Sequence, residues 1–195
     1  MQTEKIENIA TMGNFWLWSD GLSNELCDLL LKERASLIEQ TATVFGRGSE
    51  NVVNKDARDS SLCWAPTNHW IEGVMYNYGL YATECTGWNF QLGRPEGVQL
   101  TAYNKDGFYG WHEDWAPFSM SPTIRKVSVV ALLSDPKDFE GGIFQFDGGA
   151  SGGTNVEMKR GSVIAFPSFL RHQVTPVTAG KRYSAVCWIN GPRTF

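Results

Sequence analysis

The sequence predicts a mainly β domain in which N-terminal helices precede a β sandwich or barrel. From about residue 90, short runs rich in Val, Ile, Phe, Tyr and Trp follow one another, and turn-forming stretches separate most of them. Many short strands at this spacing are typical of sandwiches and barrels. Before residue 90, two segments repeat apolar residues at helical spacing. We therefore expect one domain, residues 1–195, with a helical and lid region at 1–89 and a β core at 90–195.

Two helices are expected before the β core. After a strand-like run, "NFWLWS", a helix begins near Ser23, with leucines at helical spacing at positions 26, 29, 30 and 37. A second helix is expected in "TNHWIEGVMYNYGLYATE", where Thr67 or Asn68 would cap the first turn. Between them, Thr43–Ser61 carries glycines and mixed charge without a clear period. We interpret this stretch as a long loop, and we expect Gly46–Trp64 to act as a lid over a substrate.

The β core is expected to contain the strands "VQLTAY", "KVSVVALL", "GGIFQF", "NVEMK", "GSVIAF", "HQVTPV" and "RYSAVCWI". The glycine-rich stretch Gly148–Gly153 lies between two of these runs. No Gly-Lys-Ser/Thr element follows it, so it predicts a hairpin turn rather than a phosphate-binding loop.

Composition argues against several classes of protein. The hydrophobic share of 42%, the charged share of 19% and the net charge of -4 are typical of a soluble domain that does not bind nucleic acid. No stretch is long and apolar enough to cross a membrane, and "MQTEKIENIATM" lacks the basic start and apolar run of a signal peptide. The four cysteines are widely scattered. We therefore expect a cytoplasmic protein with reduced thiols, and neither a nucleic acid nor a membrane as partner.

A histidine and an aspartate stand two residues apart in "FYGWHEDWAPF". On a strand, residues i and i+2 point to the same face, so His112 and Asp114 would point together into the sandwich while Glu113 points away. His172, at the start of "HQVTPV", is available as a third ligand. Two imidazoles and one carboxylate form the facial triad that binds Fe(II) in non-haem oxygenases. The remaining histidine, His69, has no such partner pattern and is interpreted as a surface residue.

A basic pair, Lys181 and Arg182, begins the next expected strand. A cation buried in a β sandwich is costly unless an anion meets it. A dicarboxylate that binds the metal at one end and an arginine at the other would satisfy both the metal and the cation. 2-Oxoglutarate is such a molecule, and a guanidinium group binds a carboxylate through two parallel hydrogen bonds. We expect Arg182 to face the site and Lys181, its neighbour on the strand, to face away.

The pattern His-x-Asp, a long gap, a His and then an Arg ten residues on is similar to that of the 2-oxoglutarate/Fe(II) dioxygenases. Within them the chain resembles the prolyl 4-hydroxylase type, including bacterial and phage relatives. The stretches "VQLTAYNKDGFYGWHED", "LLSDPKDFEGGIFQF" and "GSVIAFPSFLRHQVTPVTAGKRYSAVCWI" resemble blocks of that family, and "ARDSSLCW" weakly resembles its Arg-x-Ser segment. The resemblance covers most of the chain from Arg58 onward. It implies a double-stranded β-helix (jelly-roll) core with helices packed on one sheet and the site between its two sheets.

The resemblance also implies a role for each candidate site residue. Fe(II) would be held by the three ligands His112, Asp114 and His172. The distal carboxylate of the co-substrate 2-oxoglutarate would be bound by Arg182 and by Tyr103, nine residues before His112. Ser128 would lie near the same co-substrate.

The reaction that the resemblance implies is hydroxylation of a C–H bond by dioxygen. 2-Oxoglutarate would be decarboxylated to succinate and CO2, with ascorbate as an accessory reductant. The substrate would be a prolyl residue in a peptide or protein, contacted by Arg58, Trp64 and Trp188.

Three alternatives stay open on the sequence alone. An oxygenase of the same superfamily could act on a free amino acid or another small molecule, which the sequence separates poorly from a peptide. A nucleic-acid demethylase would resemble a pattern with a second arginine six residues after the first, where this chain has Trp188. A jelly-roll binding module or zinc hydrolase could use His112, Asp114 and His172 for zinc and a water. The sequence also leaves the oligomeric state, monomer or homodimer, undecided.

Overall fold

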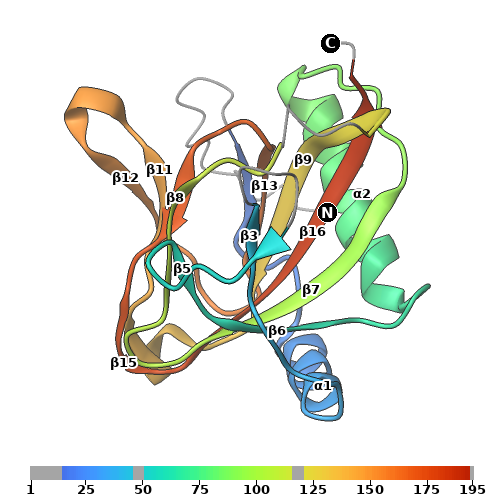
Figure 1. The fold of residues 1–195 in the computed structure, drawn as a ribbon. Coiled ribbons are helices and arrows are strands. Elements are labelled where there is room, and N and C mark those ends of the chain that lie inside the picture. Colours follow the sequence, from blue (N-terminus) through green and yellow to red (C-terminus); the bar gives the residue numbers. More distant parts are fainter. Residues whose placement is uncertain (1–14, 46–50, 116–120, 194–195) are drawn as a thin grey trace, which may run out of the picture.

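The computed structural model describes residues 15–45, 51–115 and 121–193, which form two facing antiparallel sheets with helices outside one of them (Figure 1). The larger sheet has the strand order β1-β13-β9-β16-β7-β6-β2. Its strands are β1 (Trp16–Trp18), β2 (Gln40–Thr41), β6 (Ser61–Trp64), β7 (Pro95–Tyr103), β9 (Thr123–Leu132), β13 (Val163–Pro167) and β16 (Arg182–Pro192). The smaller sheet has the order β12-β11-β14-β8-β5. Its strands are β5 (Arg58–Asp59), β8 (Phe108–His112), β11 (Phe144–Asp147), β12 (Gly153–Val156) and β14 (His172–Val174).

The two sheets pack face to face around an apolar core. Phe144 and Phe146 of the smaller sheet meet Phe166 of the larger sheet, with ring centroids 5.7 and 5.1 Å apart. The buried residues of this core are Tyr103, Val130, Phe144, Phe146, Val156, Ile164, Phe166, Val174 and Val177. The predicted fold class, mainly β with a jelly-roll core, is confirmed.

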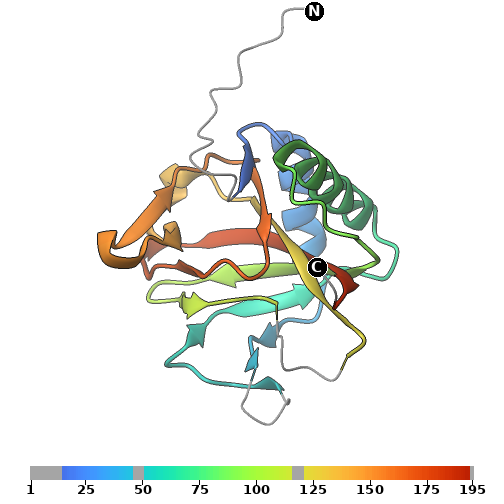
Figure 2. The same cartoon turned by 90° about the horizontal axis from the view of Figure 1, so that it is seen from above.

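A second core lies between the larger sheet and helices α1 (Asn24–Arg34) and α2 (Trp70–Thr86), which cover its outer face (Figure 2). The inner strand β9 is buried along almost its whole length. A strand that is covered on both faces has apolar residues at nearly every position, instead of apolar and polar residues in turn. This explains the sequence "KVSVVALL". The expectation that helices pack on one sheet is confirmed.

The first helix begins where the sequence predicts, and the second begins later. Ser23 caps α1, since its hydroxyl accepts the backbone N–H of Leu26 at 3.4 Å. The cap of α2 is His69, not Thr67 or Asn68: its Nδ1 accepts the N–H of Ile71 at 3.4 Å. Asn68 has a left-handed backbone, with φ of 63°, and so lies outside the helix. The predicted cap was therefore wrong by one or two residues.

His69 also corrects a second interpretation. Its Nε2 lies 3.1 Å from Oε2 of Glu33 on α1, and its side chain is only 14% exposed. His69 is thus not a surface residue but links α1 to the start of α2. The local sequence could not reveal this role, because the partner lies on another helix.

The stretch interpreted as a long loop contains short strands. β3 (Val44–Phe45) pairs with β4 (Asn51–Val52), while β5 pairs with β8 in the smaller sheet and β6 pairs with β7 in the larger one. The loop interpretation of Thr43–Ser61 was therefore wrong at β3, β4, β5 and the first residue of β6. Strands of two to four residues are too short to show a period, and their partners are distant in the sequence. Residues 46–50 of the expected lid lie outside the described residues.

The remaining strands agree with the predicted runs, with two differences. β10 (Phe139–Gly141) and β15 (Val177–Gly180) form a separate two-stranded sheet, so "GGIFQF" and "HQVTPV" each contribute to two sheets. The glycine-rich stretch joins β11 to its antiparallel neighbour β12, which confirms the hairpin turn. All four cysteines are free thiols, as expected. Over the described ranges, neither helix has the length and apolar character needed to cross a membrane.

Candidate active site

Two neighbouring strands of the smaller sheet bring the two candidate ligand histidines together. His112 is the last residue of β8 and is paired in register with His172, the first residue of β14. Their ring centroids lie 4.2 Å apart. One ligand atom from each histidine and one from Asp114 all lie within 4.8 Å of one another. The predicted set of three residues is therefore one spatial cluster.

Asp114 reaches this cluster in a way that the sequence did not indicate. β8 ends at His112, so Asp114 is not on the strand and strand alternation does not set its direction. Its backbone N–H instead donates to the carbonyl of Ser168 at 2.8 Å. The loop that follows β13 thus holds Asp114 in place.

The hydrogen bonds of the two imidazoles fix which nitrogen can bind a metal. Nδ1 of His112 lies 2.8 Å from the carbonyl oxygen of Gly110, and Nδ1 of His172 lies 2.8 Å from that of Leu170. A carbonyl oxygen only accepts, so each Nδ1 carries the proton and each Nε2 keeps its lone pair. The two Nε2 atoms lie 3.5 and 3.6 Å from the carboxylate oxygens of Asp114. Ligand histidines in metalloproteins are usually oriented by such a bond from the other ring nitrogen.

Electrostatics keep these groups in their ligating forms. Burial by itself would raise the pKa of Asp114, but the imidazoles of His172 and His112 outweigh it and hold that pKa below its usual range. Burial, followed by the neighbouring His112, lowers the pKa of His172 to about 4. At neutral pH the cluster therefore offers a carboxylate and a neutral imidazole, the forms that bind a metal ion.

A buried cation faces the cluster from the larger sheet. Arg182 is 2% exposed and pairs in register with Tyr103 of β7, whose ring centroid lies 5.5 Å from the guanidinium carbon. Burial lowers the pKa of Arg182. Within the part of the chain that the structure describes, no carboxylate lies at ion-pair distance from its guanidinium group. Lys181 is exposed and faces away, as the alternation predicts.

The glycine pair before β11 makes room for Arg182. Gly142 has φ of 58°, and a Cβ atom placed on it would lie 2.9 Å from Cδ of Arg182 and 3.0 Å from Cγ2 of Val177. Only glycine combines this left-handed backbone with such a close approach. The "EGG" stretch is thus part of the arginine's support.

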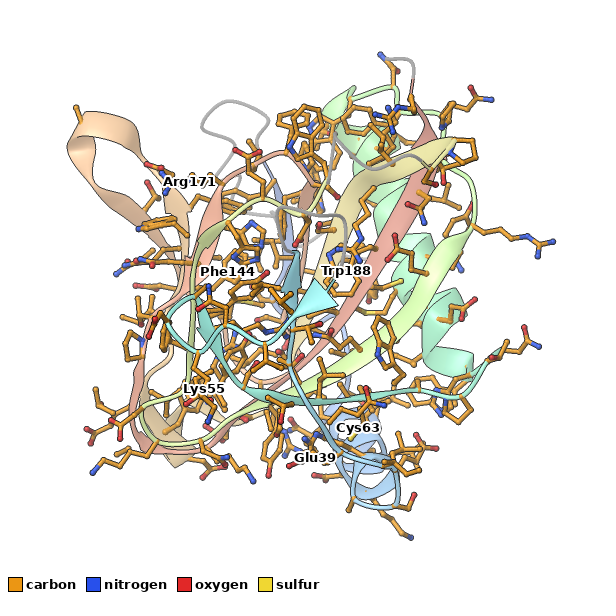
Figure 3. The ribbon with its side chains drawn as sticks, in the orientation of Figure 1. Glu39, Lys55, Cys63, Phe144, Arg171 and Trp188 are labelled. Carbon is orange, nitrogen blue, oxygen red and sulfur yellow. The ribbon has the colours of Figure 1, made fainter. Side chains whose placement is uncertain are left out.

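A cavity between the two sheets is lined both by the three candidate metal ligands and by Arg182. Besides the three ligands, its polar lining consists of Arg58, Gln99, Tyr103, Tyr109, Arg182 and Ser184. Its apolar lining consists of Val130, Phe144, Val174, Val186 and Trp188. Phe144 of the smaller sheet and Trp188 of the larger sheet mark its two walls (Figure 3).

The residues expected near the substrate differ in whether they line the cavity. Arg58 and Trp188 line the cavity and are 6% and 6% exposed. Trp64 is outside the lining and 40% exposed, with its ring 6.2 Å from that of Trp188. Arg125, on β9, lies over the Trp188 ring at 4.0 Å and binds Glu96 through two nitrogens. This ion pair supports the tryptophan wall.

Ser128 does not line the cavity. Its hydroxyl donates to Oδ2 of Asp114 at 2.7 Å and lies 2.9 Å from Oγ of Ser168. The structure therefore places Ser128 behind the carboxylate of Asp114 and outside the cavity lining, so its expected position near the co-substrate stays a prediction.

Sequence reasoning missed Tyr109, which lines the cavity beside the metal ligands. Its ring stacks on that of His112, with centroids 3.4 Å apart, and the guanidinium carbon of Arg58 lies 4.6 Å from the same ring. Regular alternation would place residues 109 and 112 on opposite faces. The register between β8 and β14 shifts, so that Tyr109 pairs with Val174 and His112 with His172. In the sequence, only the position of Tyr109, three residues before His112, indicated this contact. The β-bulge that brings the two rings onto the same face is visible only in the structure.

The comparisons with known proteins agree with this geometry. A family model described as "2OG-Fe(II) oxygenase superfamily" matches residues 98–190, the range that contains the three ligands, Tyr103 and Arg182. This range is just under half of the chain, and over it the chain is similar to the 2OG-Fe(II) oxygenase superfamily. Among curated proteins, the chain is 40% identical over 81 residues to a PKHD-type hydroxylase of Synechococcus sp. (strain CC9605), covering 42% of this chain and 36% of that protein. It is 42% identical over 78 residues to a PKHD-type hydroxylase of Azoarcus sp. (strain BH72), covering 38% and 34%. These matches thus span little more than a third of each relative.

Solved structures of other proteins share the fold over nearly the whole chain. A viral collagen prolyl hydroxylase from Paramecium Bursaria Chlorella virus-1 superposes with a TM-score of 0.68 at 20% identity, covering 91% of this chain and 96% of that one. A Pseudomonas putida prolyl-4-hydroxylase superposes with a TM-score of 0.70 at 19% identity, covering 92% and 93%. The resemblance to the prolyl 4-hydroxylase type, with bacterial and viral relatives, is confirmed.

Proposed function

We propose that this protein is an Fe(II)- and 2-oxoglutarate-dependent dioxygenase that hydroxylates a C–H bond of a prolyl residue in a peptide or protein. The observation that carries the proposal is the buried guanidinium group of Arg182. It shares one cavity with the two-histidine, one-carboxylate cluster and has no carboxylate partner among the described residues. An unpaired buried cation is costly, so the cavity is suited to an anionic ligand that also reaches the metal.

The residues present fit the two groups that such an enzyme needs. Two imidazoles with free Nε2 atoms and one carboxylate are the donor set of non-haem Fe(II) oxygenases. His112, Asp114 and His172 would hold the iron, and Arg182 with Tyr103 would hold the distal carboxylate of 2-oxoglutarate. Together, iron, 2-oxoglutarate and dioxygen supply the oxidation: 2-oxoglutarate becomes succinate and CO2, and one oxygen atom enters the C–H bond.

The protein's own contribution is orientation and exclusion of water. Val130, Val174 and Val186 give part of the cavity an aliphatic lining, and such a lining strengthens the electrostatic contacts beside it. The register of β16 with β7 fixes Arg182 beside Tyr103. Both co-substrate residues thus lie on long, buried strands rather than on loops, which favours a rigid binding site.

Two observations support the proposal of a prolyl substrate. The curated relatives are named PKHD-type hydroxylases, and two structural neighbours are named prolyl hydroxylases. The cavity lining also contains the aromatic rings of Tyr109 and Trp188, which suit an apolar ring such as that of proline. Arg58, held by a 2.9 Å bond from its Nε to Ser60 Oγ, would bind an acceptor on the same substrate.

The direct test is incubation of the protein with Fe(II), ascorbate, 2-oxoglutarate and a library of proline-containing peptides. We expect succinate in proportion to peptides that gain one oxygen atom, detected by mass spectrometry. Succinate formed without any modified peptide would favour a free amino acid or another small molecule as substrate. If 2-oxoglutarate is not consumed and zinc is retained instead, the site belongs to a zinc module and the proposal is wrong.

A second test separates substrate binding from co-substrate binding. Arg58→Met and Trp64→Ala should spare binding of Mn2+ and 2-oxoglutarate, because neither residue belongs to the ligand cluster or contacts Arg182. Both should reduce peptide hydroxylation and leave slow conversion of 2-oxoglutarate to succinate. The quantity to compare is succinate formed per oxygen atom transferred. An unchanged ratio in both variants would remove these two residues from the substrate site.

A further inference from the structure

Two serine hydroxyls stand behind the carboxylate ligand. Ser128 lies in the middle of β9, and Ser168 follows the end of β13. Oγ of Ser128 lies 2.7 Å from Oδ2 of Asp114 and 2.9 Å from Oγ of Ser168. Both serines are 0% exposed, and Asp114 is 7% exposed. The contacts are therefore shielded from water, where hydrogen bonds are strongest.

The chemistry of the groups gives this chain of contacts a direction. An ionised carboxylate only accepts hydrogen bonds, so Ser128 must be the donor to Asp114. A hydroxyl has one proton, and Ser128 already donates its proton to Asp114. The hydroxyl of Ser168 must therefore be the donor to Ser128. The order is Ser168 to Ser128 to Asp114, in which each bond polarises the next.

The same loop reaches Asp114 a second time. The carbonyl of Ser168 accepts the backbone N–H of Asp114 at 2.8 Å. Ser168 therefore fixes the main chain of Asp114 directly and its carboxylate through Ser128. This matters because Asp114 lies beyond the end of β8 and has no strand pairing of its own.

We propose that Ser128 and Ser168 are positioning residues that engage one carboxylate oxygen of Asp114 and thereby set the metal affinity of the site. Neither serine lines the cavity, so they act through Asp114 and not on a substrate or co-substrate. With Oδ2 hydrogen-bonded to Ser128, the carboxylate is directed toward binding the metal through its other oxygen. The inference rests on the proposed function only in that the cluster binds a divalent metal.

Titration of the purified protein with Mn2+ alone, followed by electron paramagnetic resonance, measures this effect without turnover. Ser128→Ala should weaken Mn2+ binding by roughly 10- to 100-fold, the usual effect of losing a group that orients a ligand. Ser168→Ala should weaken it less, because Ser128 still donates to Asp114. The double variant should bind as weakly as Ser128→Ala alone, since Ser168 acts through Ser128.

Ser162→Ala is the matched control. Ser162 is also buried, at 1% exposure, and its hydroxyl donates to the carbonyl of Ser19 at 3.1 Å, away from the metal ligands. This variant should lose thermal stability but keep wild-type Mn2+ affinity. In Co2+-loaded protein, the visible absorption bands should shift for Ser128→Ala and stay unchanged for Ser162→Ala.

The outcomes that would overturn the inference differ from those that would overturn the proposed function. If wild type binds Mn2+ and Ser128→Ala binds it equally well, the serine has only a packing role and the inference fails while the metal site stands. If the effects of the two serine changes simply add, the directed chain is wrong. If wild type binds no divalent metal, the proposed function fails and the inference fails with it.

Discussion

The ring of Tyr109 lies flat on the imidazole of His112, with centroids 3.4 Å apart and an angle of 11° between the planes. Tyr109 is thus placed to hold a metal ligand as well as to line the cavity. Tyr109→Phe keeps the ring and should retain metal affinity, whereas Tyr109→Ala leaves His112 without this support and should weaken Mn2+ binding several-fold. Metal titration of both variants is the measurement. Equal losses in the two would mean that the hydroxyl, not the stacked ring, is what matters.

The ligand cluster predicts complete loss of turnover for single substitutions. Replacing His112, Asp114 or His172 by alanine should abolish conversion of 2-oxoglutarate to succinate, because two remaining ligands do not form the facial site. The control is the remaining histidine of the chain. His69→Ala should keep turnover and lower the unfolding free energy by about 1 kcal/mol, through loss of the cap of α2. Wild-type succinate formation in any of the three ligand variants would remove that residue from the cluster.

Arg182 predicts a separation of co-substrate binding from metal binding. Arg182→Met should weaken 2-oxoglutarate binding by about 2–5 kcal/mol, the usual cost of removing one partner of a buried charge pair. Mn2+ affinity should change little, and thermal stability should hold or rise, because an apolar side chain replaces an unpaired buried cation. Lys181→Met, the exposed neighbour, is the control and should alter neither binding constant. Equal losses of metal and 2-oxoglutarate binding would make Arg182 a structural residue.

A side chain at Gly142 should weaken 2-oxoglutarate binding, which backbone strain alone would not do. Gly142→Ala and Gly149→Ala both place a side chain on a left-handed backbone, with φ of 58° and 61°. Each should therefore cost about 1 kcal/mol of stability. Only at Gly142 does the added Cβ meet Arg182 and Val177, while nothing lies within 4 Å at Gly149. Calorimetry with 2-oxoglutarate should show weaker binding for Gly142→Ala alone, and similar affinity in both variants would contradict the role given to Gly142.

The four thiols predict a simple labelling pattern. Burial raises the pKa of Cys187 to about 12, and it also raises the pKa of Cys27 and of Cys63. Cys85 is exposed at the end of α2. Native protein should therefore release one equivalent of thionitrobenzoate from Ellman's reagent at pH 8, and four after denaturation. The variant Cys85→Ser should release none in the native state.

The sequence by itself determined the fold class and most of the site chemistry. The strand runs, the leucine spacing after Ser23 and the His-x-Asp, His and Arg pattern depend on local periodicity and residue type, which the chain carries without its partners. The same reasoning predicted that Arg182 faces inward and Lys181 outward, and the structure shows Arg182 buried at the start of β16 and Lys181, just before it, exposed.

Only the tertiary structure decided what holds the site residues in place. The register shift between β8 and β14 turns Tyr109 toward His112, the loop after β13 fixes Asp114, and α1 supplies the partner of His69. Each of these contacts joins segments that are distant in the sequence or breaks the regular period of a strand. Their cause is the packing of the two sheets and the helices, which no local pattern records.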